Sequence, residues 1–334
     1  MTIRFGVVGT NWITDRFLSA AKEVKDFEIT AVFSRTEERA QEFASKHGVD
    51  HTFTDLDKMA ATDLLDAVYI ATPNSLHTEQ SILFMKNGKH VLCEKPMASN
   101  TAEIEKMIQV ATKEKVLLME AMKTTFLPNF ISIQENLHKI GKVRRFVASK
   151  CQYSSRYDSY KKGEVLNAFR PEFSNGSLMD LGVYCVFPMV ALFGEPKHIK
   201  ANGVMLGSGV DAEGSILFGY EEMEAITTHS KITNSYAPSE IQGEEGSIII
   251  DDISNLNSVE IRYRDGTSES LNRTQDKESM FYETEAFVQL VQQGMTESNI
   301  NSFERSWVTA SLMEEARKQI GLIFPADRNN DFSN

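Results

Sequence analysis

A lysine that directly follows an apolar run is the first residue whose type and position could do chemistry. His90–Cys93 is predicted to be a buried strand, and Glu94-Lys95-Pro96 comes directly after it. In an open α/β sheet, ligands bind beyond the carboxyl ends of the strands, which is where Lys95 would stand. An ammonium group there can hold a substrate oxygen and stabilise an alkoxide as it forms. A surface Glu–Lys pair after a strand is the simpler alternative, because such pairs are common.

A second candidate is the turn that follows the first apolar run, Ile3–Val8. The dinucleotide fingerprint G-x-G-x-x-G occupies this position between a strand and a helix, where backbone N–H groups bind pyrophosphate. Gly9 matches its first glycine, while Asn11 and Thr14 replace the other two. Asparagine tolerates left-handed backbone, so a phosphate turn and a plain connection remain open alternatives. The residues predicted to line this turn are Gly9, Thr10, Asn11, Trp12 and Ile13.

The end of the second predicted strand bears on the choice of cofactor. An enzyme that reads the ribose 2′-hydroxyl places Asp or Glu there, whereas this chain has Ser34 and Arg35. A serine can donate a hydrogen bond and an arginine can pair with a 2′-phosphate, which favours NADP over NAD. A solvated arginine that opens a helix is the simpler alternative, and NAD remains an option.

The loop after a further predicted strand, Ala71–His77, faces the same edge of the sheet and could contact the cofactor through its backbone and Asn74. A single histidine at a helix start is more often structural, so His77 is given no catalytic role. The remaining predicted cofactor-binding residues are Ala71, Thr72, Pro73, Asn74, His77, Glu94 and Lys95.

Alternating strands and helices must position these residues. Apolar strands that alternate with helices predict an α/β fold with a doubly wound parallel sheet, a Rossmann domain, over residues 1–122. After residue 122 a long region of strands and Gly-containing turns, 197–271, predicts a second domain, 123–334, with an antiparallel or mixed sheet. The predicted helix 303–321 could pack back on the first domain. The predicted strands are 3–8, 29–34, 67–71, 90–93, 116–119 and 143–153, and the predicted helices are 12–24, 37–47, 76–87, 101–113, 129–138, 177–192, 279–292 and 303–321.

Composition excludes several classes of protein. The 334 residues carry a formal net charge of −12, which argues against binding to nucleic acid. The three cysteines form no C-x-x-C pair, so neither a disulfide framework nor a metal site is predicted. No uninterrupted run of 18 apolar residues and no secretory leader are found, so we expect no membrane association and a cytoplasmic location.

Four motifs, in their order and spacing, resemble the Gfo/Idh/MocA oxidoreductases over nearly the whole chain. They are Gly6-Val-Val-Gly9, Ala71-Thr-Pro-Asn-Ser-Leu-His77, Glu94-Lys95-Pro96 and Asn175-Gly-Ser-Leu-Met-Asp-Leu-Gly-Val-Tyr184. Tyr184, with Phe169-Arg-Pro-Glu172 and Met119-Glu-Ala-Met122, looks most like the branch that contains glucose–fructose oxidoreductase and dimeric dihydrodiol dehydrogenase. Asn11 and Thr14 depart from the family pattern, which puts the strength of cofactor binding in question.

This resemblance implies a Rossmann domain followed by an α+β domain with a large, open, mostly antiparallel sheet, through which members form homodimers or homotetramers. It implies hydride transfer between NAD(P) and a sugar, polyol, trans-diol or related carbonyl substrate. The family lysine corresponds to Lys95, the helix aspartate to Asp180 and the His/Tyr position to Tyr184. Relatives that bind a dinucleotide only to regulate or to act as scaffolds are the alternative, and a nucleotide-binding enzyme without redox chemistry is a third.

Asp180 and Tyr184 are four residues apart and would share one face of an α-helix. A positive charge favours the phenolate, so Lys95 would lower the pKa of Tyr184, which would exchange a proton with the substrate hydroxyl. Asp180 would hold a substrate hydroxyl or orient Lys95. Arg170, beside an aromatic stretch, is a candidate wall of the substrate pocket, although that stretch could equally be a loop that covers the sheet.

Overall fold

The computed structural model describes residues 1–328, and these fold as two compact units. Unit 1 contains Met1–Lys123 together with Lys277–Ser306, and unit 2 contains Thr124–Asp276 together with residues 307–328. A single boundary after residue 122 therefore does not describe the chain, because the segment 277–306 returns to unit 1. The second division falls within the helix that was predicted over 303–321.

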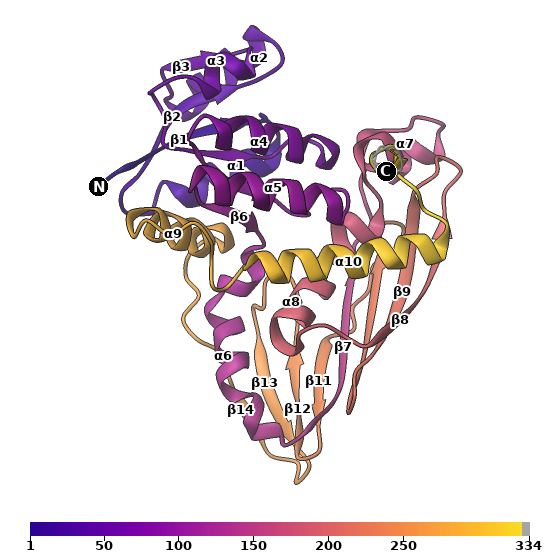
Figure 1. The fold of residues 1–334 in the computed structure, drawn as a ribbon. Coiled ribbons are helices and arrows are strands. Elements are labelled where there is room, and N and C mark those ends of the chain that lie inside the picture. The colour runs from indigo at the N-terminus through magenta and orange to yellow at the C-terminus, as the bar shows by residue number, and fades with distance from the viewer. Residues whose placement is uncertain (329–334) are drawn as a thin grey trace. The chain divides into compact units, whose positions relative to one another are not determined.

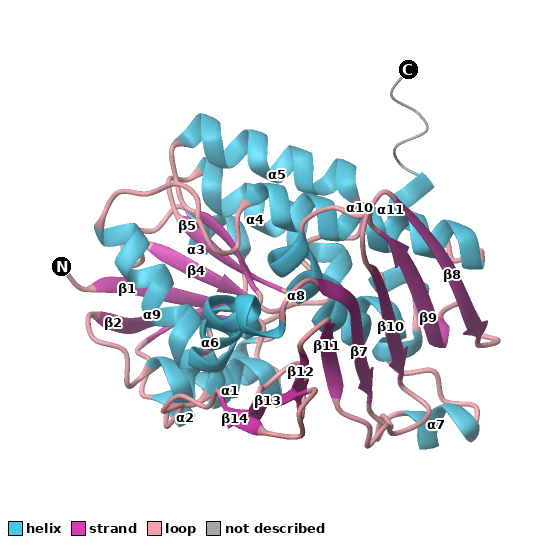
Figure 2. Ribbon diagram, turned by 90° about the horizontal axis from the view of Figure 1, so that it is seen from below, coloured by secondary structure: helices cyan, strands magenta, loops and turns pink. Residues whose placement is uncertain are grey.

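Unit 1 is built on a six-stranded sheet with the order β3-β2-β1-β4-β5-β6. Each neighbouring pair is parallel, which confirms the predicted doubly wound Rossmann fold. Helices α4 and α5 cover one face of this sheet, and α1 and α9 cover the other (Figure 2). The elements are β1 (Ile3–Val8), α1 (Trp12–Ala21), β2 (Phe27–Phe33), α2 (Glu37–His47), β3 (His51–Phe53), α3 (Leu56–Ala60), β4 (Ala67–Ile70), η1 (Asn74–Leu76), α4 (His77–Lys86), β5 (His90–Glu94), α5 (Thr101–Glu114), β6 (Leu118–Ala121) and α9 (Ser279–Gln292).

The helices of unit 1 begin where a side chain satisfies a free backbone N–H. Asn11 caps α1 and Thr36 caps α2. Asn100 accepts a hydrogen bond from Glu103 N at 3.0 Å, as predicted for a capping box, while the Glu103 carboxylate accepts from Ser99 N at 2.8 Å. These caps fix the starts of the helices that follow the carboxyl ends of the strands.

The returning segment completes the core of unit 1. Phe287 of α9 lies with its ring centroid 5.6 Å from that of Phe5 on β1. Gln292 at the end of α9 donates to the carbonyl of Met1 at 2.7 Å, and Leu118 N donates to Thr296 O at 3.4 Å. Without this segment, one face of the sheet would expose buried aromatic rings to water.

Unit 2 contains an eight-stranded sheet with the order β14-β13-β12-β11-β7-β10-β9-β8. Within the described residues β7 and β10 are its one parallel pair, so the predicted mostly antiparallel sheet is confirmed (Figure 1). The elements are α6 (Pro128–Asn136), η3 (Leu137–Ile140), β7 (Val143–Cys151), α7 (Tyr157–Lys161), η4 (Asn167–Phe169), η5 (Pro171–Phe173), η6 (Leu178–Gly182), α8 (Val183–Phe193), β8 (His198–Met205), β9 (Asp211–Gly219), β10 (Glu224–Ser230), β11 (Ser239–Gly243), β12 (Gly246–Ile250), β13 (Val259–Tyr263), β14 (Ser268–Ser270), α10 (Phe303–Ile320), which begins in unit 1, and α11 (Pro325–Arg328); η2 (Lys123–Phe126) connects the two units in sequence.

One helical run in the described chain, Pro171–Phe193, is long and apolar enough to cross a membrane by length and composition, a feature that the sequence prediction did not register. Its most apolar window has a mean hydropathy of 1.6, and 78% of that window is buried inside the protein. α8 packs against β7 and β10. The run therefore contributes the core helix of unit 2.

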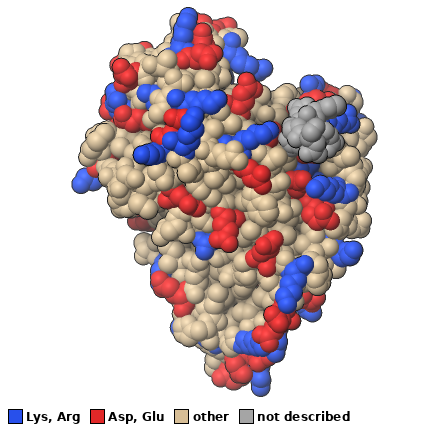
Figure 3. Space-filling model, in the orientation of Figure 1, with Lys and Arg blue, Asp and Glu red and all other residues tan. Residues whose placement is uncertain are grey.

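Charged side chains of both signs are interspersed over the face drawn in Figure 3. Among the described residues, surface ion pairs join Arg144 with Glu244 and Arg145 with Glu224.

Candidate active site

The phosphate turn depends on Gly9. Its φ of +106° is in the left-handed region, and a Cβ at this position would lie 2.6 Å from the Ala71 carbonyl oxygen. Asn11 donates from Nδ2 to that same carbonyl at 2.7 Å and accepts from Ile13 N at 2.9 Å. Asn11 therefore fastens the turn to the end of β4 and caps α1, two tasks that a second glycine could not perform.

The end of β2 carries the groups predicted to recognise a 2′-phosphate. Ser34 is buried, with its hydroxyl 3.4 Å from that of Thr10, and Arg35 is exposed. A second exposed guanidinium, that of Arg39, donates to the Thr10 carbonyl at 2.9 Å. Sequence reasoning missed Arg39, although its place in the first turn of the helix predicted over 37–47, directly after the strand end that carries Ser34 and Arg35, could have indicated it. Two arginines beside a serine and a glycine turn fit a phosphorylated dinucleotide.

Trp12 has 59% of its surface exposed although it opens α1 directly after this turn. Ile13 is half-buried, whereas Thr14 is fully buried, and its hydroxyl finds no hydrogen-bond partner among the described residues. The third glycine of the fingerprint is thus replaced by a side chain that packs beneath the helix.

A histidine joins the loops that follow β4 and β5. His77 Nδ1 lies 3.0 Å from the carbonyl of Pro96 and Nε2 lies 2.9 Å from that of Thr72. Burial lowers the pKa of His77, so the neutral ring donates to one carbonyl and faces the other. Pro96 follows a cis peptide bond. Ala71 and Asn74 are buried in the same loop, and Pro73 is half-buried.

Lys95 is half-buried at the carboxyl end of β5, and the carboxyl group of Glu94 holds its backbone. Glu94 Oε2 accepts from Lys95 N at 3.2 Å, and Oε1 accepts from the Tyr69 hydroxyl at 2.5 Å. Burial raises the pKa of Glu94. In unit 1 this side chain thus orients the main chain at Lys95, and the cofactor contact expected of Glu94 stays a prediction.

Two further buried carboxyl groups lie near Glu94, and sequence reasoning did not find them. Glu120 Oε1 accepts from Met97 N at 3.0 Å, and burial raises the pKa of Glu120 to about 7. Neither carboxyl oxygen of Glu283 on α9 finds a hydrogen-bond partner among the described residues. Burial first, and then the charge of Glu94, raises the pKa of Glu283 well above its usual value.

In unit 2 the helix that carries the other candidates does not begin as an α-helix. Leu178–Gly182 winds as a π-helix and continues as α8 from Val183. Asp180 lies in the wider turn and the half-buried Tyr184 in the α-helix. The four-residue α spacing assumed from the sequence therefore does not describe this pair, and such π turns are frequent at functional sites.

A buried polar cluster anchors the start of this helix. Asp211 Oδ2 accepts from Leu178 N at 2.6 Å, and His229 Nδ1 lies 3.0 Å from the Ser177 hydroxyl. Burial raises the pKa of Asp211 to about 6 and lowers the pKa of His229 to about 3. Gly176, with a φ of +147°, lets the chain pass, because a Cβ there would lie 2.0 Å from Asp211 Oδ1.

Asp180 has a cationic partner that the sequence did not indicate. Lys231, directly after β10, places Nζ 2.9 Å from Asp180 Oδ2. Arg170, by contrast, donates from Nε to the Val165 carbonyl at 2.9 Å and is exposed. Within unit 2 the structure thus brings Asp180 together with Lys231. Lys95 belongs to unit 1, and its convergence with Tyr184 stays a prediction.

The aromatic stretch before Arg170 packs on itself. The rings of Tyr157 and Tyr160 stack with centroids 5.8 Å apart, and both contact the buried ring of Phe169. The Tyr160 hydroxyl accepts from Ser208 N at 3.3 Å. These residues form a small apolar cluster with Ala168 and Val210 at one end of the sheet.

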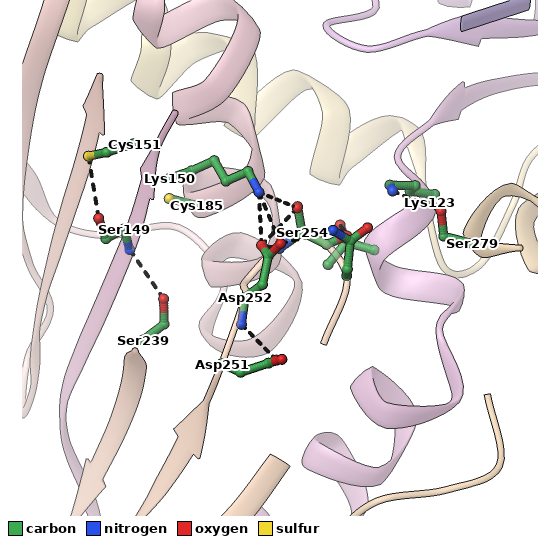
Figure 4. Close-up of polar contacts among 12 residues, drawn as sticks. Lys123, Ser149, Lys150, Cys151, Cys185, Ser239, Asp251, Asp252, Ser254 and Ser279 are labelled. Carbon is green, nitrogen blue, oxygen red and sulfur yellow. Dashed lines mark hydrogen bonds and ion pairs between the residues drawn. The ribbon is translucent and has the colours of Figure 1, made fainter. Parts of the chain in front are cut away.

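Lys150, on β7 of the same sheet, is bound by side chains of a loop and therefore serves the structure of unit 2. Lys150 Nζ contacts both oxygens of Asp252, at 2.9 and 3.1 Å, and the Ser254 hydroxyl at 2.7 Å (Figure 4). Asp252 also accepts from Ser254 N and Asn255 Nδ2. The ammonium is thus saturated by acceptors that hold the loop after β12. Within residues 1–328 no group of three or more His, Cys, Asp or Glu side chains is arranged to hold a metal ion.

Comparison with known proteins decides the family. Residues 3–122 match the family described as "Oxidoreductase family, NAD-binding Rossmann fold", and residues 137–249 match the GFO/IDH/MocA C-terminal domain. A scyllo-inositol 2-dehydrogenase (NADP(+)) of Bacillus subtilis is 61% identical over 326 residues, which cover 98% of this chain and 99% of the relative. The chain belongs to the Gfo/Idh/MocA oxidoreductases. It is an NAD(P)-dependent oxidoreductase that acts on CH–OH groups.

More distant members extend the comparison. A trans-1,2-dihydrobenzene-1,2-diol dehydrogenase of Danio rerio is 29% identical, with 98% of this chain and 99% of the relative covered. The crystal structure of a 3-ketoreductase from Actinomadura kijaniata with TDP-benzene and NADP superimposes with a TM-score of 0.81 at 25% identity, over 96% of this chain and 98% of that chain. An aldose–aldose oxidoreductase of Caulobacter crescentus shares the fold, with a TM-score of 0.85 at 20% identity, over 99% and 98% of the two chains.

Proposed function

We propose that this protein oxidises a cyclic polyol of the scyllo-inositol class with NADP, or reduces the corresponding ketone with NADPH. The observation that carries this proposal is the 61% identity to the NADP-dependent scyllo-inositol 2-dehydrogenase over 98% of the chain. The groups at the end of β2 support NADP as the cofactor, since Ser34 and the guanidinium groups of Arg35 and Arg39 suit a 2′-phosphate.

The nicotinamide, when bound, supplies hydride chemistry, and the chain's own groups handle the proton. In the oxidative direction the carbinol C–H bond breaks with its electron pair as hydride, and the hydroxyl loses its proton. Tyr184 takes this proton, and Lys95 holds the same oxygen and favours the phenolate. Asp180 accepts a hydrogen bond from another substrate hydroxyl, and Arg170 lies at the rim of the substrate pocket. Solved variants of the related 3-ketoreductase replace a lysine by alanine and a tyrosine by phenylalanine.

The proposal assigns a separate role to each unit. Unit 1 binds the cofactor, as predicted for residues 1–122, and unit 2 binds the substrate, as predicted for residues 123–334. We infer a cytoplasmic homodimer or homotetramer formed through the outer face of the large sheet. Leu217, Ile226 and Val147 are cross-strand neighbours on that face, and Leu217 is exposed. Light scattering of the Leu217→Glu variant tests the assembly, which this charge should weaken.

Two measurements test the function. The protein is first titrated with NADPH and NADH, and NADP is then reduced with scyllo-inositol, other polyols, aldoses and diols while absorbance is followed. We expect tighter binding of NADPH and turnover of a polyol. Lys95→Ala should lower kcat by several powers of ten while NADPH still binds, and Arg35→Ala should weaken NADPH more than NADH. Cofactor binding without turnover of any substrate would instead indicate a regulator or scaffold.

A further inference from the structure

The side chain of Lys231 is buried where the chain leaves β10. The residue as a whole retains 3% of its surface, and its backbone is held on both sides, because its N–H donates to Ala212 O at 2.8 Å and its carbonyl accepts from Ser154 N at 2.8 Å. A lysine in this position loses most of its hydration, which is costly unless protein groups replace the water. The two backbone hydrogen bonds of Lys231 thus fix its main chain independently of the contacts that its side chain makes.

Three groups of unit 2 surround the ammonium. Asp180 Oδ2 lies 2.9 Å from Nζ, the Ala168 carbonyl accepts at 3.4 Å, and the ring of Phe169 lies with its centroid 5.6 Å away. Asp180 supplies the one carboxylate in this set, and it sits in the π turn of the candidate helix. The carboxylate that forms an ion pair with Lys231 is therefore a residue already placed at the site, while Asp211 interacts with the same ammonium through its charge alone.

The two members of this pair differ in their exposure. The Lys231 side chain retains 4% of its surface, whereas the Asp180 side chain retains 43%. Solvent therefore reaches the carboxylate, whereas it barely reaches the ammonium. A carboxylate that is ion-paired with a fixed cation is held in one orientation, and its solvent-exposed part can accept a hydrogen bond from a substrate hydroxyl.

We propose that Lys231 is a positioning residue that fixes Asp180 as the acceptor for a hydroxyl of the polyol substrate. Lys231 thereby contributes to the preference for substrates with several hydroxyl groups, although it does not touch them. This inference rests on the proposed function and adds to it the residue that fixes the orientation of the substrate-binding carboxylate.

A double-mutant cycle of Lys231→Met and Asp180→Asn tests this inference, with scyllo-inositol and NADP as the assay. If Lys231 acts through Asp180, each single change lowers kcat/KM about 10- to 100-fold, mainly through KM, because a hydrogen bond to a charged group is lost. The double variant should then be no worse than the single variants, since both changes remove the same interaction. Lys231→Arg should retain part of the activity. The matched control is Lys197→Met, which removes a surface ion pair with Glu221 and should leave kcat/KM unchanged.

If Lys231→Met folds poorly, the unfolding temperatures of Asp180→Asn and of the double variant provide a second test. Asp180→Asn leaves a buried ammonium without its carboxylate, so the double variant should unfold at a higher temperature than Asp180→Asn alone. Losses in kcat/KM that multiply in the double variant, or a Lys231→Met enzyme with normal KM, would overturn the inference while the proposed function stands. A wild-type protein that turns over no polyol would overturn both.

Discussion

Replacing Asp211 by asparagine should change how the stability of unit 2 depends on pH. Asp211 is fully buried, and its pKa of about 6 lies above the ordinary 3.8, mainly because burial disfavours the charged form. One pKa unit corresponds to about 1.4 kcal/mol, so keeping this carboxylate ionised within the fold costs about 3 kcal/mol above pH 7.

The sign follows from proton binding. Between pH 3.8 and about pH 6 the folded state holds a proton on Asp211 that the unfolded state has lost, so wild-type stability falls as pH rises through this window. Asparagine does not titrate. The free energy of unfolding of the variant minus that of the wild type should therefore rise by about 3 kcal/mol from pH 3.5 to pH 7.5. His229 Nδ1 lies 3.6 Å from Asp211 Oδ2, and burial lowers the pKa of His229 to about 3. Its ring is therefore mainly neutral in both folded proteins over this pH range, and its contribution cancels in the difference, as do those of groups far from the substitution.

Urea denaturation followed by tryptophan fluorescence provides the assay. The chain has two tryptophans, Trp12 and Trp307, so a Trp12→Phe background leaves one reporter, located in unit 2. Asp276→Asn, which removes a carboxylate at an exposed position of the same unit, is the matched control for the loss of one negative charge. A flat difference for Asp211→Asn would refute the reasoning. A difference that falls with pH would show that Lys231 and Arg317, the cations that lower the pKa of Asp211, outweigh its burial.

Three further substitutions follow from the same structure. Gly176→Ala should lower the free energy of unfolding of unit 2, measured in urea, by about 2–4 kcal/mol, because the added Cβ meets Asp211 Oδ1. Gly163→Ala is the control: Gly163 has a φ of +89° but open space around it, so the substitution should cost only about 1–2 kcal/mol. Gly9→Ala should weaken NADPH binding at least tenfold by titration, since its Cβ meets the Ala71 carbonyl; unchanged affinity would exclude this turn as the phosphate site. Asp327→Asn should lower the unfolding free energy by about 3 kcal/mol, because it leaves the buried Arg317 guanidinium, 2.6 Å from Asp327 Oδ2, without its carboxylate. An effect below 1 kcal/mol would contradict that cost.

Periodicity and capping were sufficient to predict the long elements. The helices 37–47 and 279–292 have the predicted bounds, because each has a clear apolar face. The strand His51–Phe53 and the helix Leu56–Ala60 were missed, since three to five residues offer too few periods to register. The π turn was missed as well, because a change from four to five residues per hydrogen-bonded turn leaves no mark on an apolar sequence.

Local motifs indicated the candidate residues that follow strands or lie in glycine turns. They could not indicate Lys231, which follows Ser230 in a polar segment with no recognisable pattern. Its relation to Asp180 arises only when β10 folds beside the π turn. Glu283 was missed for the same reason, because its helix reaches unit 1 from the far end of the sequence. What sequence reasoning lacks here is the pairing of distant segments.

The return of α9 to unit 1 determines how the cofactor-binding half could be produced in isolation. A fragment that stops at Lys123 would lack Phe287 and would leave Phe5 without one of its ring contacts. Joining residues 1–123 to 277–306 by a short linker restores that contact and excises everything between them. We therefore expect the joined segments 1–123 and 277–306 to fold as a minimal dinucleotide-binding protein. A fragment of residues 1–123 alone should aggregate, because it exposes apolar surface that α9 covers.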